Sequence, residues 1–298
     1  MTERDGKVFR KRHADGDNVA MRALTVPAPA KVNLFLHVTG RRSDGRHQLE
    51  TLFVALDFGD TLHIARRDDG AIRRVAGWQD VAEEDDLALR AARALKSASG
   101  CGAGVDITVT KRIPVGGGLG GGSSDAASVL LALNRLWDLG LPRSRLMEIA
   151  LTLGADVPFF VLGEPAFACG VGEILRRATL PPMWIALIAP DIHVSTGSIF
   201  ASPQLTRDTP SAKMDVFSEG YGRNDLEEVA AASHPEIAAA LAELRRHSQH
   251  ARMTGSGSTV FASFASGELA RDAILATPPG MRGFVARTLS RHPLAAFA

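Results

Sequence analysis

The sequence predicts an α+β protein built from two lobes. The chain has 298 residues, a length that favours two units of about 150 residues over a single compact unit. Alternating apolar residues predict strands, and stretches with helical periodicity separate some of them. Because these elements do not follow a strict βαβ rhythm, α+β layering is favoured over a doubly wound sheet. No internal repeat interrupts the pattern.

The clearest predicted strand is residues 31–38, where apolar side chains occupy one face and Lys31, Asn33 and His37 lie on the other. A turn at 41–46 separates it from strands at 48–57 and 60–65. Further strands are predicted at 105–110, 166–168, 173–176, 184–189, 259–264 and 283–288. Helices are predicted at 83–97, 124–137, 143–153, 225–232, 235–247 and 267–276. Residues 202–220, which are polar and contain two prolines, are expected to form a mobile loop.

Composition narrows the class of partner. The 34 Lys and Arg residues nearly balance the 33 Asp and Glu residues, so no overall field attracts nucleic acid or anionic lipid. Cys101 and Cys169 form no CxxC pair, which argues against a disulfide framework or a structural zinc site and fits a reducing cytoplasm. No apolar run approaches the roughly 20 residues that span a bilayer. Residues 1–23 begin with a charged stretch and are expected to be a disordered extension rather than a secretory signal.

The strongest motif is a glycine-rich loop. Six of the seven residues at 116–122 are glycine, and the loop leads from the strand at 105–110 into an amphipathic helix. Backbone N–H groups in such a loop can approach an anion closely, and the N-terminus of a helix attracts negative charge. Ser123 or Ser124 is expected to cap that helix, with Asp125 favourably placed for its dipole. A polyphosphate is therefore the expected ligand, although a flexible linker is the plain alternative.

The glycine loop does not match either of two common phosphate-binding motifs in full. Gly116, Gly118 and Gly121 match the dinucleotide fingerprint, but the acidic residue expected about 20 positions later, after a strand, is missing. The P-loop motif GxxxxGK[ST] is also absent, so a lysine must come from elsewhere in the chain. A second glycine loop, residues 253–259, is explained by ordinary turn chemistry about as well as by ligand contact.

Three motifs together resemble the GHMP-type small-molecule kinases. They are Pro29-Ala-Lys31-Val-Asn33-Leu, the glycine loop 114–124 and Gly255-Ser-Gly257, in the order typical of that family. Residues 42–47, 153–159 and 170–173 resemble the branch of the family that phosphorylates a methylerythritol unit carrying cytidine diphosphate. The resemblance implies a two-lobed GHMP kinase fold with the active site in the interlobe cleft. It divides the chain into an ATP-binding lobe, 24–180, and a substrate lobe, 181–298.

The resemblance also implies chemistry and partners. The γ-phosphate of ATP would pass to a tertiary hydroxyl of the methylerythritol unit, with Mg²⁺ as a companion of ATP whose ligands are unassigned. The expected partner is a small cytidine diphosphate substrate, with no nucleic acid and no membrane, and the chain is expected to be a monomer or weak homodimer.

Residue by residue, the family's catalytic pair maps onto Lys31 and Asp156. The residues expected to bind ATP are Asp86, Lys111, Pro114, Val115, Gly116, Gly117, Gly118, Leu119, Gly120, Gly121, Gly122, Ser123 and Ser124. The residues expected to bind substrate are Asn33, Arg46, His47, Phe200, Gly255, Ser256 and Gly257. Two positions depart from the family pattern, because tyrosine is usual at Arg46 and asparagine at Asp86. Arg46 is expected to replace the tyrosine by stacking on the cytosine, with Phe200 on the opposite face.

The residues themselves suit this chemistry. A tertiary alcohol is a poor nucleophile, so a carboxylate such as Asp156 must take its proton, and an ammonium such as Lys31 keeps that carboxylate ionised. Each residue has a plain alternative: Asp156 could be a helix N-cap before Pro158, and Lys31 could be a solvated strand lysine. Asn33 shares the Lys31 face and is expected to bind substrate or Asp156. The rival functions are a GHMP kinase for homoserine, mevalonate or a sugar, and a non-catalytic nucleotide-binding module.

Overall fold

The computed structural model describes residues 21–76, 81–212 and 220–298. Most of the predicted N-terminal extension therefore lies outside the described residues, and Ala23 already begins the first strand.

The described elements confirm an α+β fold. The strands are β1 (Ala23–Arg41), β2 (His47–Arg67), β3 (Ile72–Ala76), β4 (Gly104–Thr110), β5 (Ala166–Cys169), β6 (Ile174–Arg177), β7 (Trp184–Pro190), β8 (Arg252–Met253), β9 (Val260–Phe264) and β10 (Met281–Leu289). The helices are α1 (Leu87–Ser99), α2 (Gly121–Leu136), α3 (Arg143–Leu151), α4 (Val157–Leu162), α5 (Thr196–Ala201), α6 (Glu227–Ser233), α7 (Pro235–Arg245), α8 (Gly267–Asp272) and the 3₁₀ turn η1 (Ala295–Phe297).

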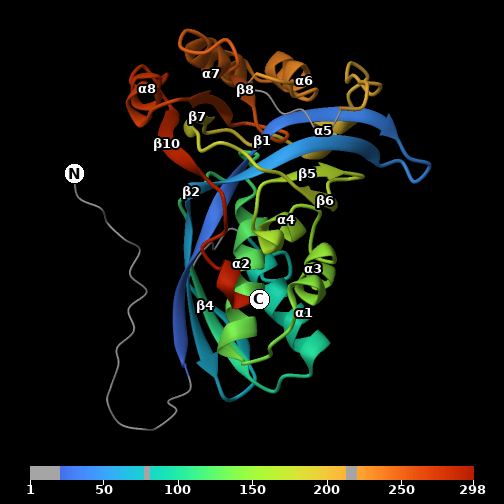
Figure 1. Cartoon of the computed structure of the whole chain (residues 1–298), viewed down its shortest axis with the longest axis vertical. Coiled ribbons are helices and arrows are strands. Elements are labelled where there is room, and N and C mark those ends of the chain that lie inside the picture. Colours follow the sequence, from blue (N-terminus) through green and yellow to red (C-terminus); the bar gives the residue numbers. More distant parts are fainter. Residues whose placement is uncertain (1–20, 77–80, 213–219) are drawn as a thin grey trace.

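The described strands join in the order β3-β4-β2-β10-β7-β9-β8, and β1 and β5 also pair with β2. Every pairing between these strands is antiparallel except that of β3 with β4. The link between β10 and β2 consists of two residue pairs, Thr288 with Leu56 and Leu289 with Ala55. This narrow junction connects a lower sheet around β2 to an upper sheet around β7 (Figure 1).

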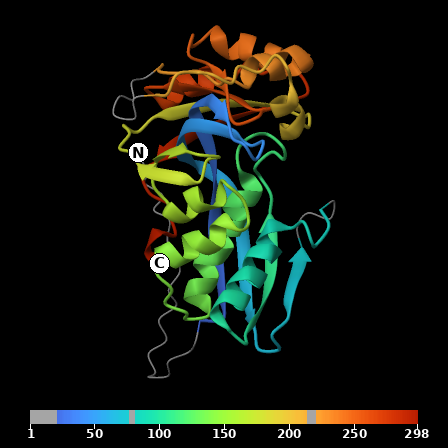
Figure 2. The same cartoon turned by 90° about the vertical axis from the view of Figure 1, so that its right-hand side faces the viewer.

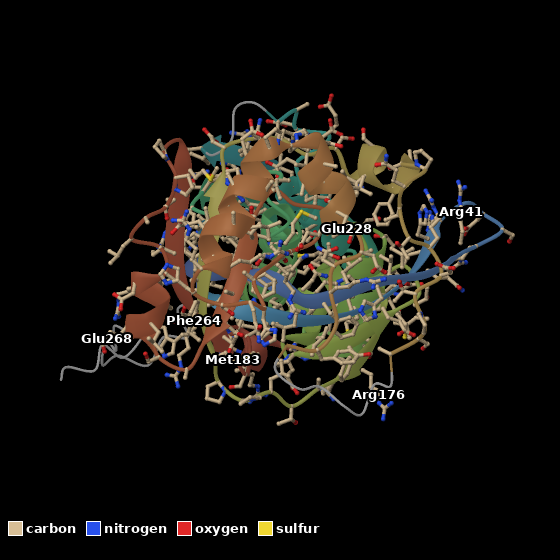
Figure 3. All side chains as sticks on the ribbon, turned by 90° about the horizontal axis from the view of Figure 1, so that it is seen from above. Arg41, Arg176, Met183, Glu228, Phe264 and Glu268 are labelled. Carbon is tan, nitrogen blue, oxygen red and sulfur yellow. The ribbon has the colours of Figure 1, made fainter. Side chains whose placement is uncertain are left out.

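The β1–β2 pair is longer and more continuous than predicted. The two strands expected at 48–57 and 60–65 are one strand, because Gly59 does not break β2 but lies where the β1 backbone approaches it closely. A side chain at Gly59 would overlap the carbonyl oxygen of Ala28. The predicted turn at 41–46 is confirmed, and Figure 3 shows Arg41 at the far end of this pair, projecting from the body of the molecule.

Each sheet carries its own helices. α1 to α4 form one layer against the lower strands, whereas α6, α7 and α8 cover the upper sheet (Figures 1 and 2). β1 contributes Val26 and Ala28 to the lower core and Leu36 and Val38 to the upper one. The chain also returns at its end, since Leu294 is buried in the lower core. The two cores are therefore interleaved in sequence, and the lobe boundary at 180/181 stays a prediction.

Several helices begin at other residues than predicted: α1 at Leu87 rather than 83, α6 at Glu227 rather than 225, and α2 at Gly121 rather than 124. α2 begins at Gly121 after Gly120, which has a left-handed backbone and provides no side-chain cap. Ser123 and Ser124 therefore lie within the first turn rather than at the N-cap, so the amides of that turn are not occupied by a capping side chain. The extent of α4 was not predicted, although a helix start before Pro158 was one alternative for Asp156, because its six residues are all buried and show no amphipathic period. The strand β3, the helix α5 and the short strand β8 were also missed.

The predicted mobile loop at 202–220 lies partly outside the described residues. Its described part is attached to the β1–β2 pair, because Thr209 N donates to Val38 O at 3.1 Å. Ser211 Oγ and Ala212 N each lie 2.5 Å from a carboxylate oxygen of Glu50. Cys101 and Cys169 are both free. Across the described ranges, no helix combines the length and apolar character that a membrane crossing requires.

Candidate active site

A cavity of about 490 Å³ lies where the glycine loop, the β1–β2 pair and the loop at 253–259 meet. It brings together predicted residues that are far apart in the sequence. The predicted site residues on its wall are Lys31, Asn33, Gly116, Gly118, Gly120, Asp156, Phe200, Gly255 and Ser256. Arg46, His47 and Gly257 do not line this cavity.

Lys31 and Asp156 form the charged centre of the cavity. Nζ of Lys31 lies 3.6 Å from Oδ2 of Asp156 and donates to Oδ1 of Asn33 at 2.6 Å. The Lys31 side chain is 4% exposed, whereas that of Asp156 is 35% exposed. Burial lowers the pKa of the Lys31 amine, and the carboxylate of Asp156 opposes that effect. The arrangement is a fixed internal cation beside a carboxylate that can reach the cavity.

The plain alternatives for both residues are excluded. Lys31 is buried, so it is not a solvated strand lysine. Asp156 stands at the N-cap position of α4, but its side chain makes no capping hydrogen bond. Lys31 N also donates to Leu119 O at 2.9 Å, which attaches β1 to the glycine loop. The strand therefore positions the lysine and the glycine loop together.

Asn33 is the hub of a buried hydrogen-bond network. Its Nδ2 donates to Thr51 Oγ1 at 2.8 Å, and its backbone N donates to Thr254 Oγ1 at 2.9 Å. Its amide oxygen accepts from Lys31 rather than contacting Asp156. Thr51 and Thr254 were missed by the sequence analysis. Thr254 precedes Gly255 in a loop already noted, but Thr51 lies within an ordinary strand pattern and gives no signal.

The glycine loop is held against the loop that contains Thr254. Gly116, Gly118 and Gly120 have positive φ angles of 66°, 75° and 71°. A side chain at Gly118 would overlap the carbonyl oxygen of Thr254, so only glycine permits this approach. Thr259 N donates to Gly117 O at 3.2 Å and strengthens the contact. Both predicted glycine loops thus form one structural unit.

A second hollow, of about 230 Å³, runs along the glycine loop. Its wall includes the predicted ATP-binding residues Lys111, Pro114, Val115, Gly116, Gly117, Gly118, Leu119, Gly120, Gly121, Gly122 and Ser123. It shares three glycines with the main cavity, and it shares Lys111 and Gly122 with a third cavity of about 140 Å³. Asp86 lies in that third cavity. The three spaces follow one another along the loop.

Lys111 anchors the far end of this row. Its Nζ lies 2.5 Å from Oδ2 of Asp60 and 2.8 Å from Oδ2 of Asp125. Burial raises the pKa of the Asp125 carboxyl to about 7, and Lys111 counteracts that rise. Asp86 caps α1, because its Oδ1 accepts from Ala88 N at 2.9 Å. Among these residues Asp60 was missed, since a lone aspartate between strand segments carries no motif.

The side chains expected at the cytidine end are arranged differently from the sandwich predicted for Arg46 and Phe200. The ring of His47, rather than Arg46, stacks on Phe200, with centroids 4.9 Å apart and planes inclined by 26°. Arg46 is exposed in the turn between β1 and β2. Arg207, which the sequence analysis missed, donates from Nε to Nε2 of His47 at 3.1 Å.

Comparison with known proteins identifies the class. The N-terminal domain model of the GHMP kinases matches residues 86–164, and the C-terminal model matches residues 207–277. The chain belongs to the GHMP kinase family.

Particular relatives are named more narrowly. The 4-diphosphocytidyl-2-C-methyl-D-erythritol kinase of Cupriavidus necator is 55% identical over 277 residues, which are 91% of this chain and 95% of that protein. A crystal structure of 4-(cytidine 5'-diphospho)-2C-methyl-D-erythritol kinase matches with a TM-score of 0.79 and 36% identity, covering 89% of this chain and 99% of the other. A mevalonate kinase structure matches with a TM-score of 0.66 at 13% identity, over 90% of this chain and all of that one, and shares only the fold.

Proposed function

We propose that this chain is an ATP-dependent kinase that phosphorylates the tertiary 2-hydroxyl of 4-diphosphocytidyl-2-C-methyl-D-erythritol, in the non-mevalonate route to isoprenoid precursors. The observation that carries the proposal is the Lys31–Asp156 pair, which faces the same cavity as the glycine loop. The names of the relatives supply the substrate. The reaction is the transfer of the γ-phosphate of ATP to an alcohol.

Asp156 is proposed as the general base. Its partly exposed carboxylate accepts the hydroxyl proton as the new P–O bond forms and the bond from the γ-phosphorus to ADP breaks. Lys31 places its amine 3.6 Å from that carboxylate, and the hydrogen bond to Asn33 fixes the direction of the amine. The remaining task in phosphoryl transfer is to position the reactants and neutralise their charge.

The glycine loop is proposed to bind the ATP phosphates along the shared wall of the cavities. The first turn of α2 has no side-chain cap, and its residues Gly121, Gly122 and Ser123 line this wall, where its backbone N–H groups would stabilise a polyphosphate. The third cavity, with Lys111, Asp86 and Gly122, is the proposed place of the adenine end. The γ-phosphate would then lie toward Asp156.

Magnesium fits this arrangement as a companion of the phosphates. Across the described residues, no group of three or more His, Cys, Asp or Glu side chains could hold a metal by itself. Ser124 Oγ is buried in the first turn of α2 without a hydrogen-bond partner among those residues, so it is the side chain we propose as a ligand. When bound, Mg²⁺ neutralises charge on the phosphates of ATP.

Arg46, His47, Phe200, Gly255 and Ser256 are proposed to bind the substrate. Phe200 and Ser256 line the main cavity, and His47 lies against Phe200. Gly257 belongs to the same loop as Ser256 but does not line the cavity, so its proposed role is to shape that loop. A monomer or weak homodimer and a cytoplasmic location stay predictions.

Coupled ADP production on a panel of alcohols tests the function. The panel contains the proposed substrate, methylerythritol phosphate without the cytidylyl group, homoserine, mevalonate and galactose. We expect fast ADP release only with the cytidine diphosphate compound, and an Asp156→Asn variant reports the background. A preference for homoserine, mevalonate or galactose would replace this substrate with another of the family. Release at the Asp156→Asn level with every alcohol would indicate a non-catalytic nucleotide-binding protein.

A further inference from the structure

Arg207 connects two parts of the proposed base-binding end that are 160 residues apart. Its Nε donates to Nε2 of His47 at 3.1 Å, at the start of β2. The rest of its guanidinium donates to backbone oxygens of Phe200 at 3.0 Å, Ser202 at 2.6 Å and Leu205 at 3.0 Å. The half-buried side chain thus uses its planar group to hold α5 and the following turn against the β1–β2 pair.

This contact decides where the proton of His47 resides. A guanidinium only donates hydrogen bonds and stays charged at all accessible pH values. Nε2 of His47 must therefore be the acceptor, so a neutral ring carries its proton on Nδ1. Burial lowers the pKa of His47, and the positive charges of Arg207 and Arg41 lower it further, which favours the neutral ring.

The Nδ1–H group remains available for a ligand. Nδ1 has no hydrogen-bond partner among the residues that the structure describes. The ring to which it belongs stacks on Phe200, and Phe200 lines the main cavity. An aromatic face beside a fixed N–H donor suits a planar base that presents an acceptor at its edge.

We propose that Arg207 is a positioning residue that fixes His47 as an Nδ1–H donor and thereby makes the site select cytosine over uracil. N3 of cytosine accepts a hydrogen bond, whereas N3 of uracil carries a hydrogen. A donor facing that N3–H group leaves both unsatisfied, whereas the other imidazole tautomer would accept from it. Locking the tautomer therefore rejects uracil, with an expected preference of roughly 10- to 100-fold. The choice of cytosine rests on the proposed function.

A purely structural role for Arg207 makes a different prediction. If Arg207 only clamps the backbone at residues 200–205, its loss weakens cytidine and uridine ligands equally. If it sets the tautomer, its loss weakens cytidine and relieves the rejection of uridine, so the ratio of the two changes. The ratio separates the two roles even where overall affinity falls in both.

The first experiment compares Km and kcat for the cytidine substrate and its uridine counterpart in Arg207→Lys and Arg207→Met. An ammonium also only donates hydrogen bonds, so Arg207→Lys should keep most of the preference for the cytidine substrate. In Arg207→Met the ratio of cytidine to uridine preference should fall by at least about tenfold. The change should appear in Km rather than kcat. His47→Phe retains a stacking ring but has no N–H donor, and in that background Arg207→Met should not change the ratio further.

The second experiment does not depend on catalysis. Nitrogen-15 NMR of the histidine rings reports the tautomer of His47 directly, and calorimetry with CDP and UDP reports the base preference. We expect Nδ1–H in the wild type and in Arg207→Lys, with mixed tautomers in Arg207→Met. An Nε2–H ring in the wild type, or equal losses for CDP and UDP in Arg207→Met, would overturn the inference. Absent kinase activity with these two results intact would instead count against the proposed function alone.

Discussion

Replacing Gly118 by alanine should displace the glycine loop from the loop that carries Thr254. Gly118 has a φ angle of +75°, which L-residues with side chains disfavour. A β-carbon there would overlap the carbonyl oxygen of Thr254 and would lie 3.2 Å from the carbonyl oxygen of Gly257. Both neighbours are backbone atoms, so relief requires movement of one loop rather than rotation of a side chain.

The expected loss of stability has two parts. The left-handed conformation costs about 1–2 kcal/mol for a residue with a β-carbon. Crowding against backbone adds roughly 1–3 kcal/mol, as for other overpacked sites. The free energy of unfolding should therefore fall by about 2–5 kcal/mol, and the Tm by roughly 4–20 °C. A loop displaced by about 1 Å should also lower kcat/KM for ATP by roughly 100-fold.

Gly140→Ala is the matched control for this substitution. Gly140 also has a positive φ, +61°, but no heavy atom of another part of the chain lies within 4 Å of its added β-carbon. The free energy of unfolding of Gly140→Ala should therefore fall only by the cost of the left-handed conformation, about 1–2 kcal/mol, and its kinetics should match the wild type. Melting curves and ATP kinetics of the two variants provide the comparison. If Gly118→Ala is no less stable than Gly140→Ala and keeps the wild-type KM for ATP, the close approach of the two loops is wrong.

Three further predictions concern the charged centre, the base-binding end and the acid stability. Asp156→Asn should lower turnover at least about 100-fold with little change in ATP binding. Lys31→Ala should do similar damage, and the double variant should lose much less than the product of the two effects, because the residues act as a unit. Arg46→Ala should raise the substrate KM by roughly 5- to 150-fold without changing the KM for ATP, and Arg46→Tyr should restore it. His292→Asn should reduce the loss of folding stability between pH 6.5 and 4. Burial is the main cause that lowers the pKa of His292 to about 4, and the positive charge of Arg143 lowers it further.

The sign of the His292 effect follows from proton binding. Below pH 6.5 the unfolded chain binds a proton at His292 that the folded chain does not. The free energy of unfolding therefore decreases as the pH is lowered, by up to roughly 3 kcal/mol near pH 4. Asparagine can still accept from Leu294 N, as His292 Nδ1 does at 3.0 Å, but it does not titrate. Equal slopes of stability against pH in both proteins would exclude His292 as the cause.

The other two predictions have equally direct contrary results. Turnover of Asp156→Asn within a few-fold of the wild type would remove that carboxylate from catalysis. An unchanged substrate KM in Arg46→Ala would show that the exposed turn residue does not stack on the base, and His47 would remain the ring that faces Phe200.

Local patterns in the sequence determined many of the secondary-structure elements and the types of residue expected at the active site. The alternation at 31–38 predicts a strand with Lys31 and Asn33 on one face, and the glycine run predicts a phosphate loop that opens a helix. Such signals are available because side-chain direction in a strand and backbone freedom at glycine are properties of neighbouring residues. The α+β class follows from the same local information.

Local patterns fail where burial or distant contacts decide the conformation. α4 has no period because all six of its residues are buried. Pro27 and Pro29 would argue against a strand, yet both lie within β1. Among the described strands β1 pairs only with β2, so it is an edge strand. An edge strand tolerates proline, which has no backbone N–H to donate to a neighbouring strand. Gly59 resembles a strand break but marks the close approach of β1.

Only the tertiary structure decided which side chains meet. The 3.6 Å separation of Lys31 and Asp156 joins residues 125 positions apart, and burial of that lysine distinguishes it from a solvated one. The contact of Arg207 with His47 arises in the same way, because the chain returns to the β1–β2 pair between β7 and β8 of the upper sheet. Hydrogen bonds and desolvation depend on distances in space. The sequence therefore identified the reactive residue types, and the packing of the two lobes determined their partners and their charge states.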